Sequence, residues 1–248
     1  MGKKTSGFLL ISSFLLLSFL FFGCTLANSA NGGAGNASSK NALSQPAPVA
    51  AQAVKEANYY TLSGLEKMAA NDTSGAMADF EKAISLNPAF APAYYARGEL
   101  RRNLSDDNGA LEDYGTSIKL DANFGQAYAS ACNVLNDLAR FSESLLTCQK
   151  AVDLGFGAPQ VINNLGVAMF KNGDVNGSIS QFTKALEGGA DGPIVLRNRA
   201  IARKKMGDIK GAIDDIEAYL ELVPGDTSSQ DFHSQLVATY EAQKSKKI

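Results

Sequence analysis

A period of 34 residues runs through the chain from Ala57 to Asp226 and constrains the fold more than any other feature. Five blocks follow one another without insertion or deletion, and they begin at Ala57, Ala91, Gly125, Pro159 and Pro193. Block positions 8 and 20 hold mostly small residues, whereas position 24 holds a large residue in most blocks. A fixed period of this length predicts a stack of similar structural units.

Each block contains two runs with helical hydrophobic spacing, separated by turn and cap residues such as Asn71–Gly75 and Asp106–Gly109. This region shows no alternating strand pattern, so we expect an all-α fold. Small residues at positions 8 and 20 would let two antiparallel helices approach closely, and the side chain at position 24 would fill the space beside them. Pro88 and Pro224 would end the second helix of their blocks.

The residues Asn163-Asn-Leu-Gly166, Lys171-Asn-Gly-Asp174, Phe182 and Ala185-Leu186 resemble the tetratricopeptide repeat family. This resemblance implies a right-handed α-solenoid of five helix-turn-helix repeats, and the alternative is a generic helical bundle. The chain departs from the family pattern at Cys132 and Cys148, at Lys67, and at residues 188–190. The repeats are expected at 57–90, 91–124, 125–158, 159–192 and 193–226.

The start of the chain has the pattern of an export signal. Lys3 and Lys4 precede an apolar and serine-containing run from Phe8 to Phe22, which is short for a membrane span. We therefore predict a signal peptide over residues 1–23. Leu20-Phe-Phe-Gly-Cys24 resembles the lipobox of prokaryotic lipoproteins, which implies lipidation at Cys24. Ordinary secretion and an uncleaved anchor are the alternatives.

Three further segments follow the predicted signal. Residues 24–53 are rich in Ala, Asn, Ser and Gly, so we predict a flexible tether. The repeat domain is expected over 54–226 and a capping helix over 227–248, with Thr227 or Ser228 as its N-cap. An apolar stripe on this helix would cover the exposed end of the array. The stripe consists of Phe232, Leu236, Val237 and Tyr240.

Charge and composition limit the function. Without residues 1–23 the chain would carry a net charge of about −4, which excludes the strong basic patch of a nucleic-acid binder. The single histidine, His233, and the acidic pairs Asp106-Asp107 and Asp214-Asp215 are interpreted as caps or solvated surface. We find no catalytic constellation, cofactor motif or metal-ligand set, and predict that the protein is not an enzyme.

Cys132 and Cys148 replace a small and a large packing residue on the two facing helices of the third block. They are positioned either to form a disulfide between these helices or to remain as two reduced, buried hydrophobic residues. A metal site is not expected, because two thiolates alone do not complete a zinc shell.

The family resemblance implies that the first helix of each repeat lines a concave groove, which would be apolar in the first repeat, amide-rich in the middle and basic in the last. Asparagine side chains carry both donors and acceptors and suit an extended peptide backbone. The carboxylate-clamp form of the family is resembled only loosely, since Ala129 and Ile194 stand where the clamp has lysines. The predicted groove residues are Tyr95, Arg102, Asn133, Asn136, Asn163, Asn164, Phe170, Arg197, Asn198 and Lys204.

Together these features predict an interaction scaffold that is exported and tethered by a lipid or signal anchor to the outer side of a prokaryotic membrane. Its partner would be a peptide or protein of the cell envelope. An accessory or regulatory domain of an envelope enzyme complex, a small-solute-binding lipoprotein and a secreted protein are the alternatives.

Overall fold

The computed structural model describes residues 47–245, and within this range the chain is all-helical. The predicted signal peptide, the lipidation site at Cys24 and most of the predicted tether lie outside the described residues. The helices are α1 (Ala47–Ala69), α2 (Thr73–Leu86), α3 (Ala91–Asn103), α4 (Asp107–Leu120), α5 (Gly125–Asp137), α6 (Phe141–Asp153), α7 (Pro159–Lys171), α8 (Val175–Glu187), α9 (Gly192–Met206), α10 (Ile209–Leu222) and α11 (Thr227–Ser245).

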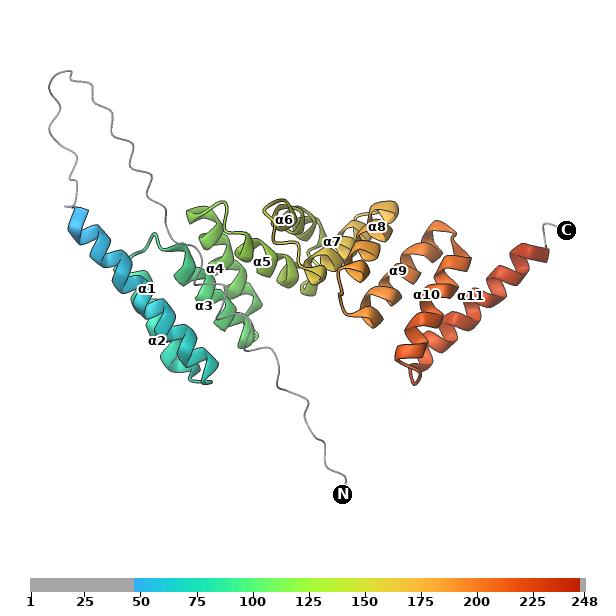
Figure 1. Cartoon of the computed structure of the whole chain (residues 1–248), viewed down its shortest axis with the longest axis horizontal. Helices are drawn as coiled ribbons and strands as arrows, with labels where there is room; N and C mark the ends of the chain where they lie inside the picture. The colour runs from blue at the N-terminus through green and yellow to red at the C-terminus, as the bar shows by residue number, and fades with distance from the viewer. Residues whose placement is uncertain (1–46, 246–248) are drawn as a thin grey trace, which may run out of the picture.

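The helices form five consecutive hairpins, α1–α2 to α9–α10, which coincide with the five sequence blocks (Figure 1). Helices α3, α5 and α7 begin at the predicted block starts, and α9 begins one residue before its block, at Gly192. Helices α2, α4, α6 and α8 also pack against the first helix of the next repeat, and α10 packs against α11. The prediction of an all-α solenoid of five helical hairpins followed by a closing helix is therefore confirmed.

Odd-numbered helices line one side of this stack. The backbones of α1 and α3, of α5 and α7, and of α7 and α9 approach one another, whereas among the described helices no comparable approach joins two even-numbered ones. The even-numbered helices are therefore spread along the outer, convex side. This arrangement places the first helix of every repeat on the concave side.

Close packing within the hairpins follows the pattern at block positions 8 and 24. A Cβ atom added to Gly98 would lie 2.7 Å from the ring of Tyr114, and one added to Gly166 would lie 2.7 Å from the ring of Phe182. Both rings are fully buried. Glycine is needed at position 8 because the aromatic side chain at position 24 occupies the space that a Cβ would take.

Aspartate caps the second helix of four repeats. Asp72, Asp106, Asp174 and Asp208 each accept a hydrogen bond from the backbone N–H of the glycine three residues later. A side chain on that glycine would overlap the capping carboxylate. The third repeat has Arg140 at the cap instead, and its guanidinium forms two hydrogen bonds with Glu143.

Helix α1 begins earlier than predicted. The composition of residues 24–53 predicts a flexible tether, but the helix starts at Ala47. Proline is tolerated in the first turn of a helix, so Pro48 does not prevent this start, and the alanines that follow favour helix. Composition pointed to a flexible segment because the tether and the start of the helix are both rich in alanine.

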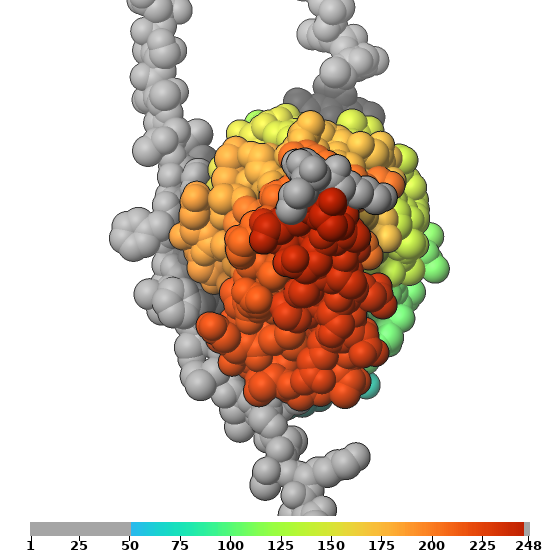
Figure 2. All heavy atoms as spheres, turned by 90° about the vertical axis from the view of Figure 1, so that its right-hand side faces the viewer, coloured from blue at the N-terminus to red at the C-terminus, as the bar shows by residue number. Residues whose placement is uncertain are grey.

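Helix α11 closes the C-terminal end of the array, which faces the viewer in Figure 2. Leu236 is fully buried against α9 and α10, and Phe232 and Tyr240 pack beside it, as the predicted stripe requires. Val237 is exposed, so its assignment to that stripe was wrong. The predicted cap is also corrected: Asp226, rather than Thr227 or Ser228, accepts hydrogen bonds from the backbone N–H and hydroxyl of Ser229.

Candidate interaction surface

The C-terminal part of the concave side presents an accessible stripe on α9. Ile194, Arg197, Ile201 and Lys204 follow one another at three- and four-residue spacing, which places them on one face of the helix. All four are exposed, including the two isoleucines at 50% and 37%. We call these four residues the α9 stripe. Apolar side chains flanked by cations can contact both apolar and acidic groups of a ligand.

A hollow of about 550 Å³ lies between the α9 stripe and the start of α11. Arg197 and Ile201 line one wall, and Asp231, Phe232 and Gln235 line the other. At the edge of this region, the Lys204 ammonium lies 4.9 Å from the centroid of the Phe232 ring, a cation–π contact. The hollow therefore joins the concave face of the last repeat to the closing helix.

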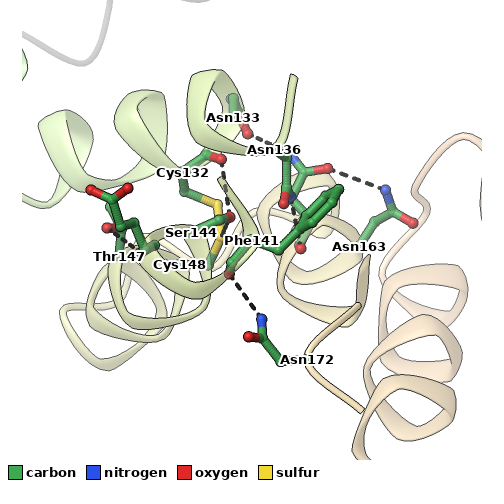
Figure 3. Close-up of a disulfide and its surroundings, with 11 residues drawn as sticks. Cys132, Asn133, Asn136, Phe141, Ser144, Thr147, Cys148, Asn163 and Asn172 are labelled. Carbon is green, nitrogen blue, oxygen red and sulfur yellow. Dashed lines mark hydrogen bonds between the residues drawn. A yellow bond between two sulfur atoms is a disulfide. The ribbon is translucent and has the colours of Figure 1, made fainter. Parts of the chain in front are cut away.

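The predicted asparagines of the central repeats bind one another. Asn198 donates to Asn163, Asn163 donates to Asn164, and Asn164 donates to Asn133, with distances of 3.2, 3.3 and 2.5 Å. Asn136 donates to the backbone carbonyl of Asn164 at 2.8 Å. These bonds link α5, α7 and α9, and Figure 3 shows the part of the network around α5 and α7.

The network changes the interpretation of these amides. Much of their hydrogen-bonding capacity joins neighbouring repeats, so a ligand would compete with contacts that hold the array together. The Oδ1 atom of Asn136 is buried without a donor among the described residues. It lies too deep for direct contact with a partner. The amides are therefore structural first, and they fix the spacing of the central helices.

Two predicted groove residues are not accessible, and their assignment to the groove was wrong. Tyr95 is buried against Tyr114 and Phe124, and burial raises the pKa of its hydroxyl well above the ordinary range. Asn163 is 2% exposed. A third residue, Phe170, is half-buried and packs against the core between the fourth and fifth repeats.

Arg102 lies on the concave side of α3, where it is half-buried. Its guanidinium is 3.7 Å from the carboxylate of the exposed residue Asp137 on α5. One helical turn away on α3, Glu99 accepts a hydrogen bond of 2.5 Å from the hydroxyl of Tyr114. Burial and the charge of Glu99 together raise the pKa of Tyr114 above its ordinary range. The concave face therefore has paired charges in the second repeat and accessible cations in the fifth.

The second and fifth repeats share an ion pair that was not predicted from the sequence. Asp113 on α4 binds Arg97 and Arg101 on α3, with nitrogen–oxygen distances of 2.8 to 3.1 Å. Asp215 on α10 binds Arg199 and Arg203 on α9 in the same way. Asp215 is buried, so its interpretation as solvated surface was wrong. The signal was available, because these residues recur at block positions 7, 11 and 23.

The first repeat has a related pair, in which Ser63 and Lys67 donate to Asp79 at 2.6 Å each. Burial opposes ionisation of this carboxyl group, but the two donors lower its pKa below the ordinary value. Repeats three and four have apolar residues at positions 7 and 11 and an uncharged polar residue at position 23. These substitutes are Ala131, Leu135, Thr147, Leu165, Met169 and Gln181.

Cys132 and Cys148 form a disulfide between α5 and α6, with sulfur atoms 2.00 Å apart (Figure 3). Both residues are fully buried. The hydroxyl of Ser144 lies 3.2 Å from the sulfur of Cys148 and donates to the carbonyl of Cys132 at 3.3 Å. The bond stands where the other repeats use a small residue beside a large one, and it links the two helices of the third repeat covalently.

Neither a cluster of three metal-binding side chains nor a helix long and apolar enough to cross a membrane occurs within residues 47–245. His233 lies 3.1 Å from Glu217 on the convex side of the last hairpin, and both are at least partly accessible. Asp106 and Asp214, one from each of the two adjacent acidic pairs in the sequence, have different roles. Asp106 caps a helix, and Asp214 forms an ion pair with Lys210 on the surface.

Comparison with known proteins agrees with this architecture. Residues 57–90 match the family model described as tetratricopeptide repeat, and they coincide with the first block. The described helices have the fold of a tetratricopeptide-repeat solenoid. No curated protein sequence matches the chain.

Solved structures resemble this one in fold at low sequence identity. YrrB, described as a TPR protein with an unusual peptide-binding site, is 19% identical with a TM-score of 0.66, covering 75% of this chain and 96% of YrrB. PilF of Pseudomonas aeruginosa is 17% identical with a TM-score of 0.62, covering 78% and 88%. MamA of Desulfovibrio magneticus RS-1 is 16% identical with a TM-score of 0.61, covering 69% and 97%.

Proposed function

We propose that this protein is a membrane-tethered scaffold that binds an extended segment of a protein partner on its concave side, with the main contacts at the α9 stripe. Solenoids of this fold are in general non-enzymatic interaction scaffolds. The observation that carries the proposal is the exposure of Ile194 and Ile201, which alternate with the accessible cations Arg197 and Lys204 along α9, next to a hollow that Arg197 and Ile201 line. An exposed apolar patch rimmed by charge is typical of an interaction site.

The chemistry of the stripe defines the ligand. Two isoleucines spaced seven residues apart can contact apolar side chains, and Arg197 can form paired hydrogen bonds with a carboxylate. Asp231 and Gln235 across the hollow can bind backbone N–H groups. The favoured ligand is thus an extended peptide with alternating apolar and acidic residues. The peptide-binding site named for YrrB supports this use of the fold.

The tether is the second part of the proposal. The signal-like start and the lipobox-like sequence before Cys24 support export and anchoring on the outer side of a prokaryotic membrane. Two acyl chains on one cysteine would supply the stable anchoring that a single chain does not. The partner would then belong to the cell envelope.

Site-specific photocrosslinking in the native cells tests the binding face. A photoreactive amino acid at Ile201 should capture a discrete protein partner, whereas the same amino acid at Leu146, which is 74% exposed on the convex helix α6, should not. Arg197→Glu should reduce the capture at position 201 because it reverses the charge beside the crosslinker. Lys210→Glu on α10 is the matched charge control.

The outcomes of this experiment separate the alternatives. If position 201 captures nothing, or captures the same products as position 146, the concave face is not the binding surface. For the tether, the full chain should take up a fatty-acid label and fractionate with membranes, and Cys24→Ser should lose both properties. Labelling that persists in Cys24→Ser would exclude that cysteine as the anchor.

A further inference from the structure

Helix α1 carries a surface that the later repeats bury. At block position 3, Ala93, Ala127, Val161 and Val195 are all buried by the preceding repeat, but Tyr59 is 66% exposed. At block position 10, the equivalent residues of repeats two to five are fully buried, whereas α1 has the exposed residue Glu66. Among the described residues, the outer face of α1 is therefore an unpartnered end of the array.

The exposed side chains of this face form a regular stripe. Lys55, Tyr59, Leu62 and Glu66 are separated by four, three and four residues, which places them on one side of the helix. Ala57, Thr61 and Gly64 are buried on the opposite side, where α1 packs against its own repeat and the next. We call the exposed set the α1 stripe. Its centre is apolar and aromatic, and its ends have opposite charges.

The order of these residues makes the α1 stripe complementary to itself. If two copies of α1 lie antiparallel about a two-fold axis between residues 60 and 61, Tyr59 of each copy faces Leu62 of the other. The same register brings Lys55 of each copy opposite Glu66 of the other. A parallel pair would instead place Lys55 against Lys55. Self-complementarity of this kind is what a two-fold symmetric interface requires.

The unexpected length of α1 also fits this arrangement. Other odd-numbered helices begin at the start of their block or one residue before it, but α1 begins ten residues before Ala57. Lys55 therefore lies in an extension that only this helix has. In the antiparallel register, the two helices overlap along about 27 Å at 1.5 Å per residue. The extension supplies the positive end of the stripe and the length for both charge pairs.

We propose that this protein forms a symmetric dimer through antiparallel packing of the α1 stripes. Tyr59 and Leu62 form the apolar centre of the interface, and two Lys55–Glu66 pairs flank it. The interface lies at the N-terminal end of the array, so both α9 stripes stay accessible for the partner proposed above. This dimer is independent of that proposal, because its residues lie on a different helix.

Charge reversal tests both the dimer and its register. Sedimentation equilibrium of the full chain in density-matched detergent should show a dimer that dissociates on dilution. Lys55→Glu and Glu66→Lys should each weaken the dimer roughly tenfold, because each changes two symmetry-related contacts. The double variant should return the dissociation constant to within about threefold of the wild-type value, since both pairs are then restored with exchanged signs.

Controls keep the result specific. Lys150→Glu, on the exposed surface of α6, should leave the dimer unchanged. Tyr59→Ser with Leu62→Ser should give a monomer with an unaltered far-ultraviolet circular dichroism spectrum, because neither side chain packs in the core. If the wild-type chain is still a monomer at about 10⁻⁴ M, the proposal is overturned. A double reversal that fails to restore association also overturns it, and would indicate head-to-tail contact instead.

Discussion

The buried ion pair of the second repeat provides a quantitative test of how this array is stabilised. Asp113 has a side chain that is 4% exposed, and three guanidinium nitrogens lie 2.8 to 3.1 Å from its oxygens. Asp113→Ala would remove the carboxylate that both arginines share; Arg97 would lose its acceptor, and Arg101 would keep its hydrogen bond to the Gly109 carbonyl. Breaking a buried pair costs 3–5 kcal/mol, and because both arginines keep partial contact with solvent we expect about 3 kcal/mol.

The third repeat suggests the compensating change. It has Ala131, Leu135 and Thr147 at the positions of Arg97, Arg101 and Asp113. Substituting all three residues of the second repeat with their third-repeat counterparts removes the charges together. The triple variant should therefore lie within about 1 kcal/mol of the wild type, since a well-packed apolar replacement of an ion pair is often neutral.

Urea unfolding at pH 7, followed by circular dichroism, measures both free energies. Glu112→Ala, next to Asp113 but exposed on α4, is the control and should change the free energy of unfolding by less than about 0.5 kcal/mol. The reasoning is refuted if Asp113→Ala costs no more than this control. It is also refuted if the triple variant is as unstable as the single one, because the cost would then not arise from unpaired charge.

Three other predictions concern the disulfide, the contact between Gly166 and Phe182, and the ionisation of Asp79. The native chain should be lighter than the reduced chain by two hydrogens, and reduction of the disulfide should lower the free energy of unfolding by about 3 kcal/mol; equal masses would exclude the bond. Gly166→Ala should destabilise the fold by about 2 kcal/mol in urea unfolding, because the new methyl group meets the Phe182 ring, whereas Gly115→Ala, which has open space, should not. Because the pKa of Asp79 is lowered in the folded state, its stabilising effect is complete above the ordinary value of 3.8 and is lost as the pH falls through the folded value. The difference in unfolding free energy between wild type and Asp79→Asn should thus be larger at pH 7 than at pH 2.5, and a constant difference would contradict this.

The sequence by itself determined the repeating part of the structure. The period, the hinges and the small-to-large packing pairs were all predictable, because each repeat is a local unit whose helices contact only near neighbours in the chain. The turn at Asp106 and the fit of Gly166 to Phe182 depend on residues within one hairpin. The repeated Arg–Asp pairs were also visible in the sequence, because arginines stand at block positions 7 and 11 and aspartate at position 23 in both the second and the fifth repeat.

The tertiary structure decided which side chains of the odd-numbered helices are accessible. Tyr95 and Asn163 have positions that the family pattern assigns to the groove, yet both are buried: Tyr95 packs in one cluster with Ala127 and Ala131 of the following repeat, and Asn163 accepts a hydrogen bond from Asn198 of the following repeat. Accessibility depends on the size of side chains one repeat away, which no pattern within a single repeat contains. For the same reason, only the structure showed that Tyr59 in the first repeat and Ile201 in the last repeat remain exposed, at opposite ends of the described array.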